Sequence, residues 1–165
     1  MDIQVFDNFL STEDLERAEN IIKNKKWDYG YSSDPTTKYD NPFWRADLKS
    51  DLFFSIYVKE KIEEKLEKKL HVNKVYANGQ TFGQDGTFHQ DDTLDNAITV
   101  CMYLNNVTET DGPLIIKVPN EIKMVAIEPI HNRLVIFPSK YFHKGMSFNR
   151  YTSGLRVCLA WKCVA

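Results

Sequence analysis

The sequence contains no apolar run long enough to cross a bilayer, and residues 1–4 lack the basic start and apolar core of a secretory signal. We therefore expect a soluble, cytoplasmic protein without a membrane partner. The chain has only three cysteines and no Cys-x-x-Cys pair, which excludes a disulfide framework and the common cysteine zinc sites. Cys101 and Cys158 lie in apolar, strand-like runs, so we expect both to be small core residues.

The chain also lacks a strong excess of charge of either sign. Its net charge is −2, and phosphate binding normally requires a basic face, so a nucleic-acid partner is not expected. No internal repeat or linker is visible. With 165 residues, 42% of them hydrophobic, the chain can bury its own core, and we expect one domain over residues 1–165. The sequon Asn106-Val107-Thr108 has no expected role in a chain without a secretory signal.

Helical periodicity is confined to the first 70 residues. After a short strand at residues 3–6, Ser11 or Thr12 caps a first helix, and a second is expected over residues 50–70. The charged run of the second helix is interpreted as a solvated face. The apolar stripes are Leu15, Ala18 and Ile22 in the first helix, and Leu52, Ile56, Ile62 and Leu66 in the second.

Residues 28–47 follow neither a helical nor a strand pattern. They are rich in aromatic residues and interrupted by Gly30, Pro35 and Pro42. Segments of this kind are either ordered loops packed by their own rings or lids over a site, and the sequence leaves both open.

Beyond residue 71 the pattern changes to about eight short strands separated by turns. This predicts a mainly β fold, a sandwich or barrel, with the two helices covering one face of a sheet. The expected extended segments are residues 74–80, 81–83, 87–90, 97–105, 114–118, 123–127, 133–137, 141–148 and 155–163.

The most informative short stretch is His89-Gln90-Asp91. In a strand, residues i and i+2 point to the same side, so His89 and Asp91 project together and Gln90 turns away. One further histidine would complete a 2-His-1-carboxylate facial triad, which holds Fe(II) and leaves coordination positions open. His143 is the candidate. It follows a strand-like run that ends in a turn at residues 138–139, so it is expected near a strand end, at the rim of the sheet. His-x-Asp alone is weak evidence, since a lone strand histidine is more often a hydrogen-bonded core residue.

From Tyr76 to Trp161 the sequence resembles the Fe(II)- and 2-oxoglutarate-dependent dioxygenases, closest to their small prolyl-4-hydroxylase-like branch. The resemblance implies a double-stranded β-helix (jelly roll) with N-terminal helices packed on one sheet. Six segments carry it, in the family's order: Gly86-Thr87-Phe88-His89-Gln90-Asp91, Met102-Tyr103-Leu104-Asn105, Asp111-Gly112-Pro113-Leu114, Asn132-Arg133-Leu134-Val135-Ile136-Phe137-Pro138-Ser139, Phe142-His143-Lys144-Gly145, and Gly154-Leu155-Arg156-Val157-Cys158-Leu159-Ala160-Trp161-Lys162.

The resemblance also implies roles. The two histidines and Asp91 would bind Fe(II), and Arg156 would grip the far carboxylate of 2-oxoglutarate through paired hydrogen bonds. Tyr103 would add a hydrogen bond to this co-substrate, and Leu114 would form an apolar wall. The implied activity is that of a hydroxylase acting on a peptide residue or small molecule. It couples oxidative decarboxylation of 2-oxoglutarate by O2 to oxidation of a substrate C–H bond.

Several positions stay open at the level of sequence. Tyr103 is equally compatible with a core strand, and Arg150 could replace Arg156 as the anchor. Tyr76 and Phe82 compete for the strand position that faces the co-substrate.

Four further residues are expected to lie away from the reacting centre. His71 and His131 are expected at the surface, and Asp92 either at the rim or directly behind the candidate ligands. Trp161, by strand alternation, should face away from Arg156.

Two other classes of function are compatible with the same residues. The first is a jelly-roll module that binds a metal or ligand without turnover. The second is a cupin-like iron oxygenase that needs no co-substrate.

Overall fold

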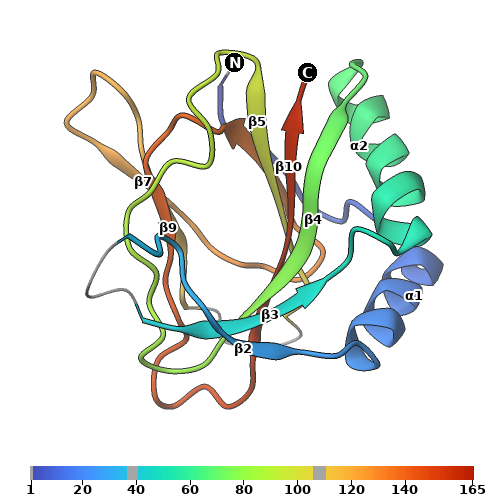
Figure 1. Cartoon of the computed structure of the whole chain (residues 1–165), viewed down its shortest axis with the longest axis horizontal. Coiled ribbons are helices and arrows are strands. Elements are labelled where there is room, and N and C mark those ends of the chain that lie inside the picture. The colour runs from blue at the N-terminus through green and yellow to red at the C-terminus, as the bar shows by residue number, and fades with distance from the viewer. Residues whose placement is uncertain (1, 37–40, 106–110) are drawn as a thin grey trace.

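The computed structural model describes residues 2–36, 41–105 and 111–165. The sequon at residues 106–108 and part of the aromatic segment, residues 37–40, lie outside the described residues. A large antiparallel sheet dominates the fold, with the strand order β1-β8-β5-β10-β4-β3-β2 (Figure 1). Its strands are β1 (Gln4–Phe6), β2 (Asp28–Tyr31), β3 (Phe43–Asp47), β4 (His71–Gln80), β5 (Ala97–Tyr103), β8 (Leu134–Pro138) and β10 (Arg156–Val164).

A smaller sheet faces the large one. It contains three antiparallel strands in the order β7-β6-β9, where β6 spans Leu114–Lys117, β7 Met124–Ile127 and β9 His143–Gly145. A compact cluster that includes Tyr103, Ile116 and Phe137 fills part of the space between the sheets. The two facing sheets match the sandwich that the strand pattern predicts and the double-stranded β-helix that the resemblance implies.

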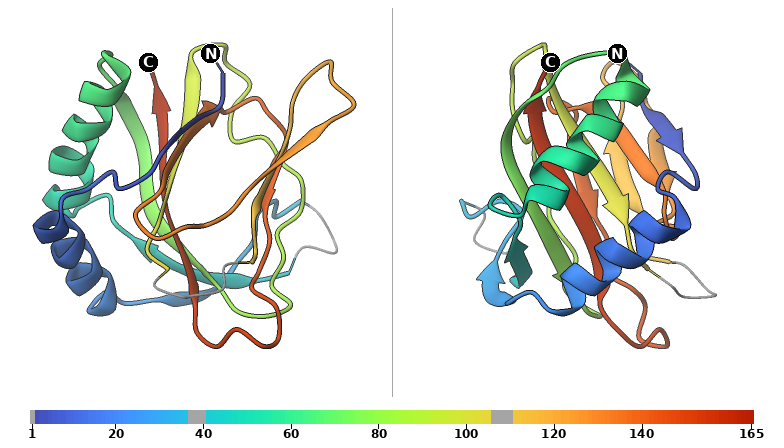
Figure 2. Two further views of the ribbon diagram at one scale, coloured as in Figure 1. Left: turned by 180° about the vertical axis from the view of Figure 1, so that it is seen from behind. Right: turned by 90° about the vertical axis from the view of Figure 1, so that its right-hand side faces the viewer.

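Two helical segments cover the outer face of the large sheet (Figures 1 and 2). The first, α1 (Thr12–Lys23), begins at Ser11, whose side chain accepts a hydrogen bond from the backbone N–H of Asp14. Its Ala18 and Ile22 are buried against the sheet, as predicted. Within the described ranges, no helix is both long and apolar enough to cross a membrane.

The second helical segment differs from the prediction. It is a π-helix, η1 (Phe53–Val58), followed directly by α2 (Lys59–Leu66). Leu52 and Ile56, expected in the apolar stripe, are 69% and 48% exposed. A π-helical turn holds more residues than an α-helical turn, so a stripe counted at α-helical spacing selects the wrong positions. The residues that pack on the sheet are Phe53, Phe54, Val58 and Ile62.

The predicted solvated face of this segment contains one buried charge. Glu63 is only 4% exposed and accepts hydrogen bonds from Lys59, Lys69 and the backbone N–H of Leu70. Burial opposes ionisation, but these bonds lower the pKa of Glu63 to about 2. The charged run therefore also contains a residue that stabilises the fold.

Alternate residues on the strands of the large sheet point to opposite faces. One face packs against the helices, and the other faces the small sheet. On β5, Val100 and Met102 pack toward the helices, whereas Cys101 and Tyr103 face the small sheet. Trp161 is fully buried on the helical side and donates a hydrogen bond to the carbonyl of Phe54, as strand alternation predicts. Cys101 and Cys158 are buried free thiols, as expected.

The aromatic segment is partly regular, whereas its sequence predicts an irregular structure. Its ends form β2 and β3, which extend the large sheet beyond β4. On β3, Ala46 packs in the helical core, while Phe43 and Arg45 line the space between the sheets. The hairpin therefore supplies one wall of that space.

Candidate functional site

Three side chains able to bind a metal meet between the two sheets. They are His89, Asp91 and His143, and their ligand atoms all lie within 4.8 Å of one another. The Nε2 atom of His143 is 3.1 Å from Asp91 Oδ2, and the Nε2 atom of His89 is 3.6 Å from Asp91 Oδ1. The side chains are 5–19% exposed, so the cluster is largely shielded from water.

Backbone pairing brings these residues together. His89 and His143 exchange both of their backbone hydrogen bonds, with N–O distances of 3.1 and 3.0 Å. The N–H of Asp91 donates to the carbonyl of Ser139 over 3.0 Å. The loop that carries the His-x-Asp pair is thus attached to β9 and to the turn before it.

The tautomers of the two imidazoles follow from their hydrogen bonds. Each Nδ1 atom lies 2.9 Å from a backbone carbonyl oxygen, that of Thr87 for His89 and that of Tyr141 for His143. An N–H on each Nδ1 leaves the Nε2 lone pairs facing the Asp91 carboxylate. These converging acceptors need a cation between them. A 2-His-1-carboxylate set of this kind fits a divalent iron ion.

The surroundings of Asp91 favour its charged form. Thr99 donates a hydrogen bond to Oδ2 over 2.6 Å, and the ammonium of Lys162 also contacts Oδ2. Burial raises the carboxyl pKa, but the charge of Lys162 and the two imidazoles outweigh it and hold the pKa of Asp91 well below its ordinary value. Burial lowers the pKa of His143, which favours the neutral, metal-binding imidazole.

A cationic residue, Arg156, lies at the start of β10. The residues of β10 that face the cavity run from Arg156 to Lys162, so Arg156 lies at the end away from Asp91. Arg156 is 2% exposed, and it donates from Nε to the carbonyl of Gly112 over 2.7 Å and from Nη1 to Gln80 over 2.9 Å. Gly112 has a positive φ of 72°, and a β-carbon there would lie 2.8 Å from the carbonyl oxygen of Ser147. This glycine turn therefore holds the carbonyl that orients the guanidinium.

The hydroxyl of Tyr103 is buried beside this anchor and has no hydrogen-bond partner among the described residues. The guanidinium carbon of Arg156 lies 5.3 Å from the centre of the Tyr103 ring. Burial raises the pKa of Tyr103 well above its ordinary value, so the hydroxyl is an uncharged donor. Because buried polar groups rarely remain unpaired, this hydroxyl and the guanidinium fit a bound carboxylate.

Both ends of the site open into one cavity of about 450 Å³ between the sheets. Leu114 lines it, as does Tyr76, whereas Phe82 is 64% exposed and lines none of it. Tyr76 is therefore the upstream aromatic residue that faces the site. Alternate residues of three strands supply a large part of the lining: Lys74, Tyr76, Asn78 and Gln80 from β4, Cys101 and Tyr103 from β5, and Arg156, Cys158, Ala160 and Lys162 from β10.

The remaining candidates lie outside the centre of the cavity. Arg150 is exposed and packs on Tyr151, so Arg156 is the cation beside Tyr103. His71 is exposed, as expected. Asp92 accepts a hydrogen bond from the backbone of Leu94 and caps a turn.

Two expectations need refinement. His131 is half-buried instead of solvent-facing, because its Nε2 atom lies 2.6 Å from Glu19 on α1. Gln90 is exposed, as predicted, but lies on the rim of the cavity, where its amide donates to the carbonyl of Lys140.

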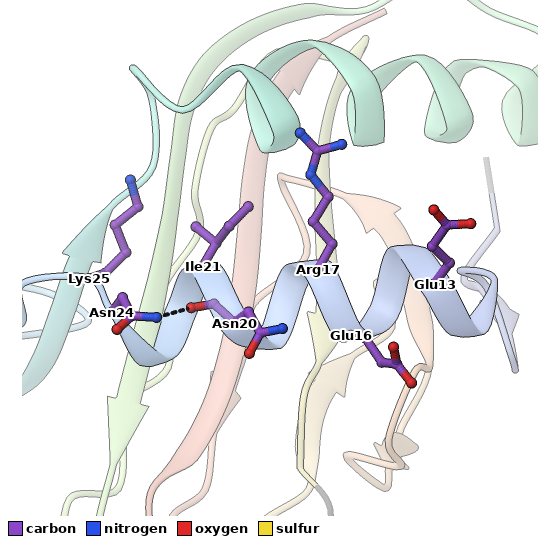
Figure 3. Close-up of a pocket in the computed structure, with 7 residues that line it drawn as sticks. All are labelled: Glu13, Glu16, Arg17, Asn20, Ile21, Asn24 and Lys25. Carbon is purple, nitrogen blue, oxygen red and sulfur yellow. Dashed lines mark hydrogen bonds between the residues drawn. The ribbon is translucent and has the colours of Figure 1, made fainter.

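A second hollow, of about 650 Å³, runs along α1 (Figure 3). Arg17, Ile21 and Lys25 project to one side of the helix, toward the second helical segment. The hollow is bordered mainly by exposed side chains of a single helix, and Arg17 is engaged with the ring of Phe53, 4.7 Å away. It lacks the converging buried acceptors of the inter-sheet cavity.

A family model described as the 2OG-Fe(II) oxygenase superfamily matches residues 70–160, more than half of the chain. The chain belongs to this superfamily. It is an iron- and 2-oxoglutarate-dependent dioxygenase, and it uses O2 and a further substrate. A comparison with curated protein sequences finds no match.

Several solved structures share the fold of this dioxygenase. A 2OG-Fe(II) oxygenase family oxidoreductase from Burkholderia pseudomallei superimposes with a TM-score of 0.77 at 8% identity, over 98% of this chain and 84% of the other. A prolyl hydroxylase from Trichoplax adhaerens, in complex with a peptide fragment of hypoxia inducible factor, superimposes with a TM-score of 0.73 at 18% identity. The match covers 98% of this chain and 83% of the other. HygX from Streptomyces hygroscopicus, with nickel, 2-oxoglutarate and hygromycin B bound, superimposes with a TM-score of 0.71 at 12% identity. The match covers 98% of this chain and 82% of the other.

Proposed function

We propose that His89, Asp91 and His143 are the iron ligands of this dioxygenase. The observation that carries the assignment is the convergence of two Nε2 lone pairs and one carboxylate within 4.8 Å. Both imidazoles are held by hydrogen bonds from Nδ1 to carbonyl oxygens, and Asp91 is held by Thr99. The ligand set is therefore preorganised, with no need for side-chain rearrangement when the ion binds.

Arg156 and Tyr103 bind the distal carboxylate of 2-oxoglutarate in this proposal. Arg156 uses Nε and Nη1 to fix its own orientation and has further N–H groups for a ligand. The Tyr103 hydroxyl, which has no partner in the described part of the protein, donates the additional hydrogen bond. Leu114 provides an apolar wall, which limits water around the co-substrate.

The reaction proposed is hydroxylation of a peptide residue or a small molecule. Bound iron and 2-oxoglutarate supply the oxidising chemistry, in which O2 decarboxylates 2-oxoglutarate to succinate and a substrate C–H bond is oxidised. The protein's part is to position both reactants and to keep the cavity shielded. We further propose that the whole chain, residues 1–165, forms a single domain and that the enzyme acts in the cytoplasm.

A succinate-release screen tests this function. Purified enzyme is supplied with Fe(II), 2-oxoglutarate and O2 and presented with peptides, free amino acids and nucleotides in parallel. We expect succinate in step with oxidised product from a peptide or a small molecule, and none from nucleotides. Strongest turnover with nucleotides would contradict the proposed substrate class, and 2-oxoglutarate-independent O2 consumption would contradict the role of the co-substrate.

A further inference from the structure

We propose that the cavity contains a second oxyanion site, centred on Arg45 with Lys74 as a further positive charge of the same cavity, which binds a carboxylate or phosphate group of the substrate. The proposal rests on the proposed function, because it assigns the 2-oxoglutarate carboxylate to Arg156 and leaves Arg45 for the substrate. Arg45 and Lys74 both line the cavity that contains the candidate metal site. Arg45 on β3 pairs with Asn78 on β4, and Lys74 lies four residues from Asn78 on the same strand.

Arg45 is held by aromatic rings. Its guanidinium carbon lies 4.0 Å from the centre of the Tyr76 ring and 5.0 Å from that of Tyr31. Packing of the guanidinium against ring faces fixes its plane but uses none of its N–H groups. The guanidinium makes no hydrogen bond or ion pair with any residue of the described ranges. Its planar edge therefore remains available to a carboxylate or phosphate, which it matches through two parallel hydrogen bonds.

The acidic residues nearest to Arg45 on the sheet have other partners. Asp28, its neighbour on β2, forms an ion pair with Lys26 over 2.9 Å. Asp47, two residues along β3, accepts a hydrogen bond from the backbone N–H of Lys49 over 2.8 Å. Neither carboxylate contacts the guanidinium, so no acidic residue of the described ranges neutralises Arg45.

The charges of the cavity leave room for one further anion. Four cations line it, and Asp91 is the one acidic residue among the described lining residues. Lys162 is matched by Asp91, and Arg156 is assigned to 2-oxoglutarate. Lys74 lies directly across from Lys162 on the paired strands and has no ion pair within the described residues. Among the described lining residues, Arg45 and Lys74 therefore remain as unmatched positive charges, which favours an anionic group on the substrate.

Direct titration with two simple oxyanions tests the site without knowledge of the substrate. Sulfate and acetate are each titrated by calorimetry into the enzyme loaded with Mn(II) and saturating 2-oxoglutarate, so that Arg156 is occupied. We expect at least one anion to bind, with Arg45→Met weakening it about ten- to hundredfold, as for loss of a charged hydrogen bond. Arg45→Lys keeps the positive charge but loses the planar group that forms two parallel hydrogen bonds. Its anion affinity should therefore lie between those of the wild type and Arg45→Met. Tighter sulfate indicates a phosphate-bearing substrate, and tighter acetate a carboxylate-bearing one.

Arg150→Met is the matched control, because Arg150 also packs on a tyrosine ring, that of Tyr151, but lies outside the cavity. It should leave anion binding unchanged. Normal 2-oxoglutarate binding without anion binding, or equal binding by Arg45→Met and wild type, would overturn the oxyanion site alone. Failure of metal-dependent 2-oxoglutarate binding in the wild type would instead overturn the proposed function. Anion titration of the metal-free Arg156→Met protein, with and without Arg45→Met, would then still decide the oxyanion site.

Discussion

The guanidinium of Arg156 lies over the ring of Tyr103, with its central carbon 5.3 Å from the ring centre, and the Tyr103 hydroxyl beside it has no hydrogen-bond partner in the described structure. A buried donor without a partner costs the folded protein free energy, on the order of 1–3 kcal/mol. The same donor is ready for a ligand that brings an acceptor. The Tyr103 hydroxyl is therefore expected to lower the stability of the ligand-free protein and to strengthen the binding of a ligand beside Arg156.

Tyr103→Phe should affect stability and binding in opposite directions. Removing the unpaired hydroxyl should leave the melting temperature of the ligand-free protein unchanged or slightly higher. It should weaken 2-oxoglutarate binding about tenfold, the value of one hydrogen bond to a charged group. Thermal unfolding and calorimetric titration of 2-oxoglutarate measure the two effects. A destabilised protein with unchanged 2-oxoglutarate affinity would show that Tyr103 is only a core residue.

Arg156→Met should separate co-substrate binding from metal binding. Loss of the cation should raise the 2-oxoglutarate concentration needed for half-maximal binding more than a hundredfold, as expected when a buried charge loses its partner. Metal affinity should change only a few-fold, since Arg156 makes no contact with the three metal-binding side chains in the structure. Binding titrations of each, with Arg150→Met as control, give the comparison. Equal losses of metal and 2-oxoglutarate affinity would argue against the anchoring role.

Glu63→Gln should lower stability in a pH-dependent manner. The pKa of Glu63 is about 2 in the folded protein against an ordinary value of 4.5, so its ionised form stabilises the fold at neutral pH. The contribution, on the order of 3 kcal/mol, is fully present above pH 4.5 and is lost as the pH falls through 2. Urea unfolding at several pH values should show a large difference between the two proteins at pH 7 and a small one near pH 2. A difference independent of pH would contradict the account.

Local periodicity predicted much of the fold and one half of the site. His89 and Asp91 do point into one site, but residues 87–91 form a loop with a single β-bridge at His89, where the sequence predicts a strand. Strand alternation correctly turned Trp161 toward the helices. Applied once more from Arg156, it would also have placed Lys162 on the cavity face of β10, though not its contact with Asp91. That signal was present in the sequence and was missed.

Other features depend on contacts between distant segments. The bridge between His89 and His143 joins residues far apart in the chain, and no local pattern specifies it. Arg45 faces the cavity because β3 pairs with β4, whereas the glycine and prolines of that segment favoured an irregular structure. The π-helix at Phe53–Val58 likewise follows from packing of two adjacent phenylalanines on the sheet, for which helical spacing gives no signal.

The most direct test of the metal and co-substrate site is anaerobic absorption spectroscopy of the enzyme with Fe(II) and 2-oxoglutarate. Chelation of iron by 2-oxoglutarate produces a weak visible band that neither component gives alone. We expect this band in the wild type, and its loss in His89→Ala and Asp91→Ala, both still folded as judged by circular dichroism. A band of wild-type intensity in either folded variant would contradict the assignment of His89, Asp91 and His143 as the iron ligands.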